Sequence, residues 1–410
     1  MSDLESWIWF SGLRKLRFRT RRALLAKYDG AKGLRYADRR EIETLPGLLP
    51  EERNELLEKH GAEAERIIRR CAQEQIKILT FQDAAYPERL RNIPDPPYVL
   101  YVSGDMPDVD AEPVIAVVGT RKSTRYGDKM ARDIAAGIAA CGGIVATGLA
   151  AGIDSNAAIG ALDANGTIIG VLGVAINHIY PSANAKLYAR VRESGVLISE
   201  YPPDAQGSKE WFPQRNRIIA GLSLGVVVPE APERSGALIT AHKALDYGRD
   251  VFAVPANADS PKGRGSNRLI KEGAALVTDA WDVMECYLPQ YPDRISRKEP
   301  AIPDDRQEDQ NASGAKDAGI GGDFYMFRSP NRGREQSGSS TETLKLQLAS
   351  LTEQQLRIVG VMDRPSMHVD DIIDLTKLPT SAVLSELTML QIMGFVVQEP
   401  GKRFTLNISK

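Results

Sequence analysis

From Pro113 onward, six short apolar runs alternate with alanine-rich or polar segments of helical character, and three of the runs end in a glycine. The runs are VIAVVG, GGIVATG, TIIGVLG, GVLIS, LGVVVPE and DVFAVP, and they are rich in β-branched residues. Continuous apolar strands that alternate with helices indicate a parallel sheet covered on both faces. The sequence therefore predicts an α/β fold, an extended Rossmann-like, doubly wound parallel sheet over residues 76–288, to which IKILTF and PYVLYV add two strands.

The flanking regions differ in character from the sheet. Residues 1–75 predict a small helical domain, of the SAM or helix-hairpin-helix kind, because Trp7, Phe10 and Leu13 are spaced for one face of a helix. Residues 289–345 are polar and rich in Gly and Ser, so they cannot bury enough apolar surface to offset chain entropy. They predict a flexible linker.

Residues 346–410 predict three helices followed by a hairpin whose turn is Pro400–Gly401, which is a winged-helix arrangement. The helical spacing of four apolar side chains predicts the buried face of the third helix. These are Leu384, Leu387, Leu390 and Met393.

The bulk composition narrows the function classes. With 52 Lys and Arg against 54 Asp and Glu, the net charge is −2, so a nucleic-acid site must come from local clusters of cations. Cys71, Cys141 and Cys286 are isolated, which argues against a zinc site or a disulfide framework. No signal peptide and no apolar run of roughly 18 residues is present, which predicts a soluble cytoplasmic protein with no membrane association.

The first strand of the sheet ends in VVGTRKSTRYG, where Gly119 and Arg121 precede a helix expected to begin near Tyr126. In an open α/β sheet, ligands bind at the carboxyl ends of strands, and the N–H groups of the next helix favour an anion. The Arg121 guanidinium could meet a phosphate bidentately. The spacing is not that of the GxGxxG fingerprint.

The second strand ends in ATGLAAGID, and Asp154 admits two interpretations. It could contact a ribose or act as a catalytic acid. It could equally be the N-cap of the helix over residues 155–162, since Asp is a preferred cap.

A third stretch, KEWFPQRNRIIAGLS, places Lys209, Arg215 and Arg217 beside Trp211 and Phe212. Such a mixture suits single strands, because cations hold the backbone while rings stack on bases. The alternative is a loop whose aromatic side chains belong to the core.

Two further segments predict helix N-termini near the same sheet edge. Ser235 and Gly236 come before the helix ALITAHKAL, and Gly265, Ser266 and Asn267 come before another. We expect two or three helix N-termini and several guanidiniums to converge on one sheet edge. A basic run near the N-terminus could also touch phosphates, or could form a solvated helix face. It consists of Arg14, Lys15, Arg17, Arg19, Arg21 and Arg22.

The segments VVGTR, GLAAGID, YPSAN, SEYPP, FPQRNRIIAGLS, ERSGALITA, GRDVFAVP and GSNRLIKEGA occur in the order typical of the DNA-processing protein A family, also called Smf. The resemblance covers about residues 80–285. It implies a protein that binds single-stranded DNA, protects incoming DNA and loads the RecA recombinase during natural transformation. It also implies that the chain is not an enzyme; we expect no cofactor, no metal and a homodimer.

Residue by residue, the resemblance implies three groups of DNA contacts. Gly119, Thr120 and Arg121 resemble the phosphate-binding turn of the family. The family's segment of base-stacking and basic residues resembles the stretch that here contains Lys209, Phe212, Asn216 and Arg217. Supporting contacts at helix termini correspond to Ser235, Gly236 and Asn267. The chain departs from the family pattern at Ala151, Ala158, Ala175 and Asn177, which bears on affinity for DNA.

Two other function classes are weaker. A nucleotide-hydrolysing enzyme of the phosphoribohydrolase type would need an acid near the anomeric carbon, and Glu230 and Glu233 are available, but PEAPERSGALITA stands where its PGGxGTxxE motif would be. A sequence-specific regulator would need cations or amides on the recognition helix, yet TSAVLSELTMLQIMG contains no Lys or Arg. In the wing, Lys402 and Arg403 are basic, and this domain could instead bind a protein.

Overall fold

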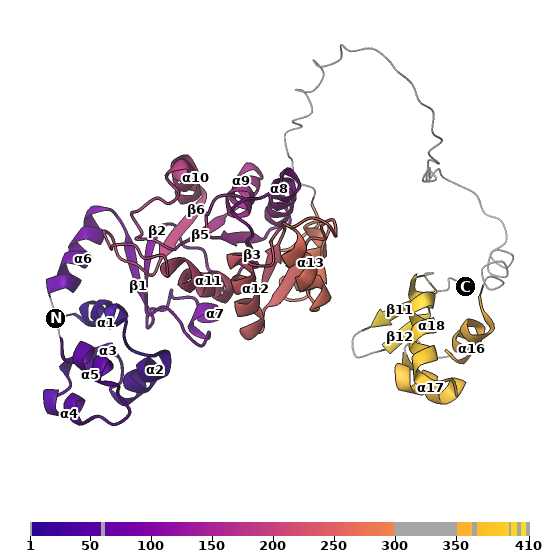
Figure 1. The fold of residues 1–410 in the computed structure, drawn as a ribbon, viewed down its shortest axis with the longest axis horizontal. Helices are drawn as coiled ribbons and strands as arrows, with labels where there is room; N and C mark the ends of the chain where they lie inside the picture. The colour runs from indigo at the N-terminus through magenta and orange to yellow at the C-terminus, as the bar shows by residue number, and fades with distance from the viewer. Residues whose placement is uncertain are drawn as a thin grey trace, which may run out of the picture. The chain divides into compact units, whose positions relative to one another are not determined.

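A computed structural model describes residues 2–58, 62–298, 351–362, 367–392, 395–399 and 403–406. The chain divides into two compact units, Met1–Ser313 and Gly314–Lys410. In the first unit, a large sheet carries helices on both faces (Figure 1).

The described sheet of the first unit has nine strands in the order β1-β2-β6-β5-β4-β3-β7-β8-β9. From β6 to β9 all neighbours are parallel, whereas β2 pairs antiparallel with both β1 and β6. The predicted doubly wound sheet is confirmed, and its antiparallel pairs lie at one edge. The bounds are β1 (Lys77–Thr80), β2 (Val99–Gly104), β3 (Val114–Val117), β4 (Ile144–Thr147), β5 (Ile168–Leu172), β6 (Gly195–Ser199), β7 (Gly225–Val228), β8 (Asp250–Ala253) and β9 (Ala275–Leu276).

The strand order reverses beside β3. After β3 the chain adds β4, β5 and β6 on one side, then crosses to place β7 on the other side. Helices α8 (Arg125–Ala140), α9 (Ile153–Asp163) and α10 (Ala185–Ser194) cover one face, and α11 (Trp211–Leu222) and α12 (Gly236–Asp246) cover the other (Figure 1). The short α7 (Glu88–Arg91), η1 (Ser182–Asn184), α13 (Arg264–Lys271), α14 (Trp281–Met284) and η2 (Glu285–Tyr287) complete the domain.

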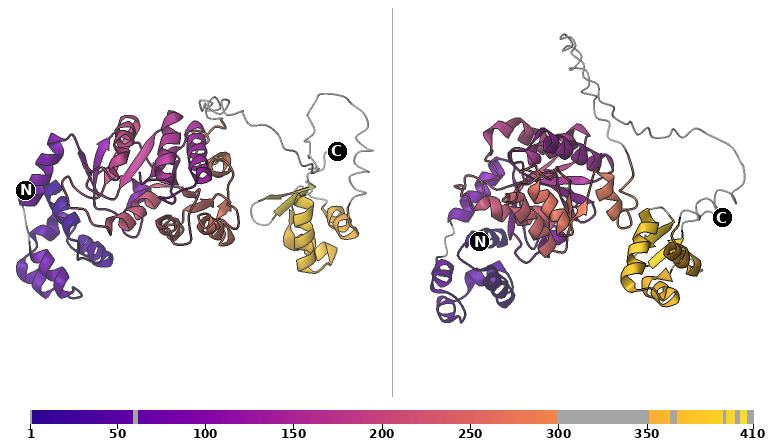
Figure 2. Two further views of the ribbon diagram at one scale, coloured as in Figure 1. Left: turned by 45° about the horizontal axis from the view of Figure 1, so that its top comes forward. Right: turned by 45° about the vertical axis from the view of Figure 1, so that its right-hand side comes forward.

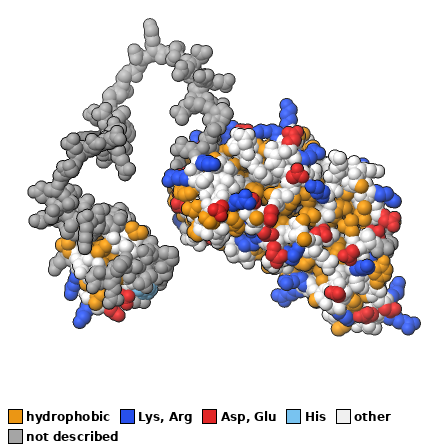
Figure 3. Space-filling model, turned by 180° about the vertical axis from the view of Figure 1, so that it is seen from behind, with side chains coloured by type: hydrophobic (Ala, Val, Ile, Leu, Met, Phe, Trp, Pro, Cys, Tyr) orange, Lys and Arg blue, Asp and Glu red, His pale blue; other side chains and the backbone are white. Residues whose placement is uncertain are grey.

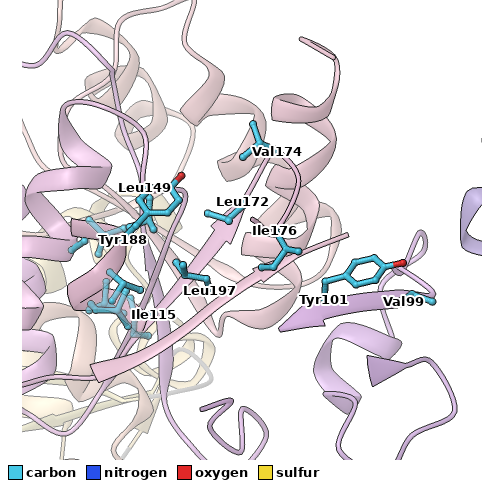
Figure 4. Packing of buried hydrophobic residues seen from close by; sticks show 14 of the residues in the cluster. Val99, Tyr101, Ile115, Leu149, Leu172, Val174, Ile176, Tyr188 and Leu197 are labelled. Atoms are coloured by element: carbon cyan, nitrogen blue, oxygen red, sulfur yellow. The ribbon is translucent and has the colours of Figure 1, made fainter. Parts of the chain in front are cut away.

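The core lies on both faces of the sheet because successive side chains of a strand point to opposite sides. Along β3, Ile115 and Val117 enter one apolar cluster, whereas Val114 and Ala116 enter the other. Figure 4 shows side chains of the first cluster, among them Ile115 of β3 and Leu197 of β6. This double burial explains why the parallel strands read as continuous apolar runs rather than alternating ones.

The N-terminal residues form helices, as predicted, and these lie beside the β1–β2 edge of the sheet (Figures 1 and 2). Trp7 stacks on Tyr98 with ring centroids 6.3 Å apart, and Phe10 meets Tyr98 edge-on at 4.9 Å. The helices therefore share their core with the sheet. Their bounds are α1 (Asp3–Gly12), α2 (Phe18–Lys27), α3 (Ala31–Tyr36), α4 (Arg39–Thr44), α5 (Pro50–Leu57) and α6 (Ala62–Gln73).

Half of the N-terminal basic run holds the fold together. The Arg14 guanidinium lies 4.9 Å from the Trp211 ring centroid, Arg17 pairs with the buried Glu52 at 2.9 Å, and Arg21 lies over Phe10. These three side chains therefore contact other parts of the fold, whereas a solvated helix face, one alternative for the basic run, would leave them in water. Lys15, Arg19 and Arg22 are exposed, and their contact with phosphates stays a prediction.

The sheet domain packs beyond its predicted end at residue 288. Ile295 is buried, and the Tyr291 hydroxyl accepts a hydrogen bond of 2.8 Å from Arg89. The rest of the predicted linker, from residue 299, lies outside the described residues.

The second unit contains the three predicted helices and a hairpin around its own apolar core. A short strand that the sequence did not suggest, β10, pairs with β12. Leu387 and Leu390 are buried as expected, while Met393, the turn at Pro400–Gly401 and the side chain of Leu384 lie outside what the structure describes. The bounds are α16 (Glu353–Val361), β10 (Met367–His368), α17 (Val369–Thr376), α18 (Thr380–Ile392), β11 (Val396–Glu399) and β12 (Arg403–Leu406).

The surface of the described chain shows no concentration of a single charge on the face seen in Figure 3, where cationic and anionic side chains are interspersed. None of the described helices is long and apolar enough to cross a membrane. Within the same residues, no group of three or more His, Cys, Asp or Glu side chains could hold a metal ion, and the three cysteines are unpaired.

Candidate functional site

A cavity of about 300 Å³ opens at the carboxyl ends of β3, β4 and β7. The loop after β3 contributes Gly119 to Arg121, and the segment after β4 contributes Ala150 and Asp154. The remaining wall comes from α11, the loop after β7 and the N-terminal part of α12. The cavity thus lies where the strand order reverses, which is where open α/β sheets bind their ligands.

Two glycines allow the loops to meet. Gly152 has φ +80°, and a Cβ there would lie 2.4 Å from the carbonyl oxygen of Thr120. A Cβ on Gly148 would lie 2.3 Å from the Arg215 guanidinium. A side chain at Gly152 would separate the β3 and β4 loops, and one at Gly148 would displace Arg215 of α11, so the GLAAGID segment needs glycine at both.

The N-terminus of α12 offers an anion site in the cavity. Ser235 caps the helix, its hydroxyl accepting the N–H of Ala237 at 3.3 Å, and Ser235, Gly236 and Ala237 all line the wall. Asn216 braces this turn by donating to the Gly236 carbonyl at 3.2 Å. The positive end of the helix dipole therefore faces the cavity, with the exposed Arg234 at its rim.

Aromatic rings and a cation flank the opposite side. The Arg121 guanidinium lies 5.0 Å from the centroid of the Phe212 ring, and Phe212 contacts Tyr180 at 5.2 Å with the planes tilted by 47°. Arg121 is exposed and makes no ion pair among the described residues. Sequence reasoning missed Tyr180 as a site residue, although it noted the YPSAN segment that contains it.

The floor of the cavity holds a buried Arg–Asp pair of charges. Arg215 donates to the carbonyl oxygens of Gly148, at 2.8 Å, and Val171, and burial lowers its pKa. Burial raises the pKa of the Asp154 carboxyl, against the opposing effects of Arg215 and of backbone donors such as the Gly119 N–H at 3.3 Å. These contacts tie the cavity loops to α11.

The interpretation of Asp154 as an N-cap is wrong. The cap of α9 is Gly152, and Asp154 lies inside the first turn. Its carboxylate reaches back to the β3 loop through Gly119 instead. Among the residues that line the cavity, Asp154 is the one carboxylate.

The structure brings most of the predicted site residues together. Those that line the cavity are Gly119, Thr120, Arg121, Phe212, Asn216, Ser235 and Gly236. Lys209, Arg217 and Asn267 do not line it. Lys209 is exposed just before α11 begins. DNA contact by any of these residues stays a prediction.

The other two residues are held by contacts of their own. Arg217 is buried and pairs with Glu200 at 2.7 Å and with Asp95 at 3.1 Å, and these carboxylates raise its pKa. Asn267 lies within α13 rather than before it, and its amide bonds the N–H and carbonyl groups of Ala256. Both side chains therefore act within the fold, away from the cavity.

Two of the other expected helix N-termini, those of α8 and α13, bind protein groups that follow β7. Glu230 accepts hydrogen bonds from the N–H and hydroxyl of Thr124, the cap of α8, at 2.8 and 2.7 Å. The Ala231 carbonyl accepts from the Gly265 N–H at the start of α13 at 2.7 Å. The N-termini of α8 and α13 therefore begin at the same sheet edge, near the end of β7, but neither lines the cavity.

The doubly wound sheet, its strand-end cavity and the winged-helix unit define a Rossmann-like protein with a cavity at the topological switch point. The chain belongs to the family of DNA recombination-mediator protein A, whose model matches residues 77–288. A model of the DprA winged helix domain matches residues 342–402.

Relatives and solved structures agree with this assignment. Protein Smf of Synechocystis sp. is 34% identical over 339 residues, covering 81% of this chain and 80% of that protein. The DNA processing protein DprA of Bacillus subtilis is 39% identical over 220 residues, covering 54% of this chain and 74% of its own length. The X-ray structure of DNA processing protein A from Streptococcus pneumoniae is 31% identical, with a TM-score of 0.61, and covers 70% of this chain and 98% of that one.

Proposed function

We propose that this chain binds single-stranded DNA at the strand-end cavity and performs no chemistry on it. The observation that carries the proposal is the Arg121–Phe212 pair, a cation 5.0 Å from an aromatic face at the lip of the cavity. Proteins that bind single strands combine such cations, which hold phosphates, with rings on which bases stack. The N-terminus of α12 supplies a second position for a phosphate.

The family assignment supports DNA as the ligand, because its description is that of a recombination mediator. We infer that the chain protects incoming single strands and passes them to the RecA recombinase during natural transformation. The test is the rate of RecA filament formation on strands covered by a single-strand-binding protein, with and without this chain. Faster filament formation supports the inference, and an unchanged rate opposes it.

We also propose a homodimer. On α12, Ile239 and Leu245 are 43% and 55% exposed, and the exposed His242 lies between them at helical spacing. A stripe of apolar side chains on one helix suits a symmetric contact with a second copy. Light scattering should give the mass of two chains for the wild type and of one for Leu245→Arg.

The alternative function is that of a nucleotide-hydrolysing enzyme of the phosphoribohydrolase type. Asp154 favours it, as a buried carboxyl with a raised pKa that lines the cavity. Glu230 does not, because both of its oxygens are bound to Thr124. Release of free base from nucleoside monophosphates, abolished by Asp154→Asn, would establish the enzyme. We expect no release.

The experiment that tests the main proposal is a gel-shift comparison of single- and double-stranded DNA over a salt series. If phosphates are bound, the logarithm of the association constant should fall linearly with the logarithm of the salt concentration. The single strand should bind more tightly than the duplex, because its bases are free to stack. Equal affinity for both forms, or binding independent of salt, would overturn the proposal.

A further inference from the structure

Tyr180 presents an open aromatic face on a well-braced loop. Its side chain is 46% exposed, yet its carbonyl oxygen accepts a hydrogen bond of 2.9 Å from the hydroxyl of the buried Tyr188. Its ring rests against Phe212, with centroids 5.2 Å apart. The ring is therefore held in place while much of its surface remains available to a ligand.

A second, smaller cavity of about 70 Å³ lies on the Tyr180 side of Phe212. It shares Arg121, Ala150, Phe212 and Arg215 with the main cavity, so Phe212 and Arg121 form a common wall between the two. The small cavity is too small to enclose a base. A base can instead lie across its mouth, on the flat face that Tyr180 provides.

Building on the proposed binding of single strands, we propose that Tyr180 is a second base-stacking platform. One nucleotide stacks its base at Phe212, and its neighbour lays its base on the exposed face of Tyr180. The Arg121 guanidinium, which lines both cavities, faces the phosphate between them. Two rings in series add stacking energy for every sequence, because each base has an aromatic face.

The geometry of the two rings also selects against a duplex. Their centroids are 5.2 Å apart and their planes are tilted by 47°. Bases in a duplex strand are nearly parallel and rise by about 3.4 Å per step. Bases that lie on both rings must therefore be unstacked from each other, which a single strand permits and a paired strand resists.

The test measures the affinity of the full chain for a short oligothymidylate by fluorescence anisotropy. Tyr180→Ala and Tyr180→Leu should weaken binding about five- to hundredfold, the loss of one stacked base. Tyr180→Phe should retain wild-type affinity within about twofold, because the ring remains. Tyr36→Ala is the matched control, since Tyr36 is 60% exposed on α3 and lines none of the described cavities.

A second ligand separates stacking from an indirect effect through Phe212. On an abasic strand of the same length, the penalty of Tyr180→Ala should disappear, because no base is left to stack. A penalty of equal size on the abasic strand would overturn the proposal. If Tyr180→Ala does not fold, the wild type can be photocrosslinked to a strand that contains iodouridine. An adduct mapped to Tyr180 would support the stacking platform, and the absence of that adduct would oppose it.

The outcome also distinguishes this inference from the proposed function. Wild-type affinity in Tyr180→Ala, together with weak binding by Phe212→Ala, would remove the second platform and leave single-strand binding intact. Failure of the wild type itself to bind oligothymidylate would remove both.

Discussion

The guanidinium of Arg121 lies 5.0 Å from the centroid of the Phe212 ring, so a cation from the loop after β3 covers an aromatic face presented by α11. The two residues come from different elements of the chain, and both line the strand-end cavity. The arrangement places a charge for phosphate and a surface for a base side by side.

Replacing Arg121 with Ala should weaken the binding of single strands of every sequence. It should also reduce the slope of the logarithm of affinity against the logarithm of salt concentration (the salt slope) by about 0.7, the contribution of one phosphate contact. Anisotropy titrations over a salt series measure both quantities. Arg297→Ala is a matched control, because Arg297 is exposed and lies 5.5 Å from the Trp281 ring but lines none of the described cavities. An unchanged slope in Arg121→Ala would contradict a phosphate contact at this residue.

Phe212→Ala should cost roughly 1–3 kcal/mol of binding free energy if the ring stacks on a base. Phe212 is half-buried and packs against Gly173, so a loss of stability is also expected. Thermal melts beside the binding assay separate the two effects. A variant that melts early but binds with wild-type affinity once folded would show that Phe212 serves the core alone.

Arg217→Ala should act on stability rather than on DNA binding. Removing the guanidinium leaves Glu200 largely buried without its 2.7 Å partner, at a cost of about 3 kcal/mol in the free energy of unfolding. Urea denaturation measures this loss, and the folded variant should keep its salt slope. A normal melt combined with a reduced slope would restore Arg217 to the DNA interface, as the sequence resemblance implies.

The Arg17–Glu52 pair should make the helical N-terminus sensitive to acid. The hydrogen bonds from Arg17 lower the pKa of the buried Glu52 carboxyl to about 2. Because the folded-state pKa lies below the ordinary value, the pair stabilises the fold at neutral pH, and this contribution is lost as the pH falls from about 4.5 towards 2. Glu52→Gln should lower the free energy of unfolding by about 1.5–3 kcal/mol at neutral pH, the range for hydrogen bonds to charged groups.

The measurement is urea denaturation, followed by tryptophan fluorescence, at several pH values. The difference between Glu52→Gln and the wild type should shrink across the acid range. Glu43→Gln is the control, because Glu43 pairs with Arg39 on the surface of α4, where such pairs contribute at most about 1 kcal/mol. A difference that does not depend on pH would rule out the ionised Glu52 as its source.

Deleting the chain from residue 346 onward should leave single-strand binding nearly intact. The cavity is lined entirely by residues of Met1–Ser313, and the two units have separate apolar cores. The third helix of the winged-helix unit, α18, also contains no Lys or Arg for phosphates. A folded truncation that binds at least tenfold more weakly, about 1.4 kcal/mol, would place part of the binding energy in the removed residues.

The sequence by itself determined the strands other than β9 and β10, their order along the chain, and the turns at the carboxyl ends of β3 and β4. Burial on both faces of a parallel sheet leaves a continuous apolar run, and this is a local pattern that can be read without coordinates. The Ser235 cap of α12 and the need for glycine at Gly152 are equally local, because they depend on the backbone conformation of one turn.

Only the tertiary structure decided which cations line the cavity. Arg215 and Arg217 are two positions apart on α11, so they point to different sides of the helix. Arg215 lies in the floor of the cavity, whereas Arg217 meets Asp95 and Glu200 from distant parts of the chain. Helix and strand patterns arise from neighbours in sequence, but an ion pair depends on which remote segments pack together. The role of each arginine is therefore settled by packing.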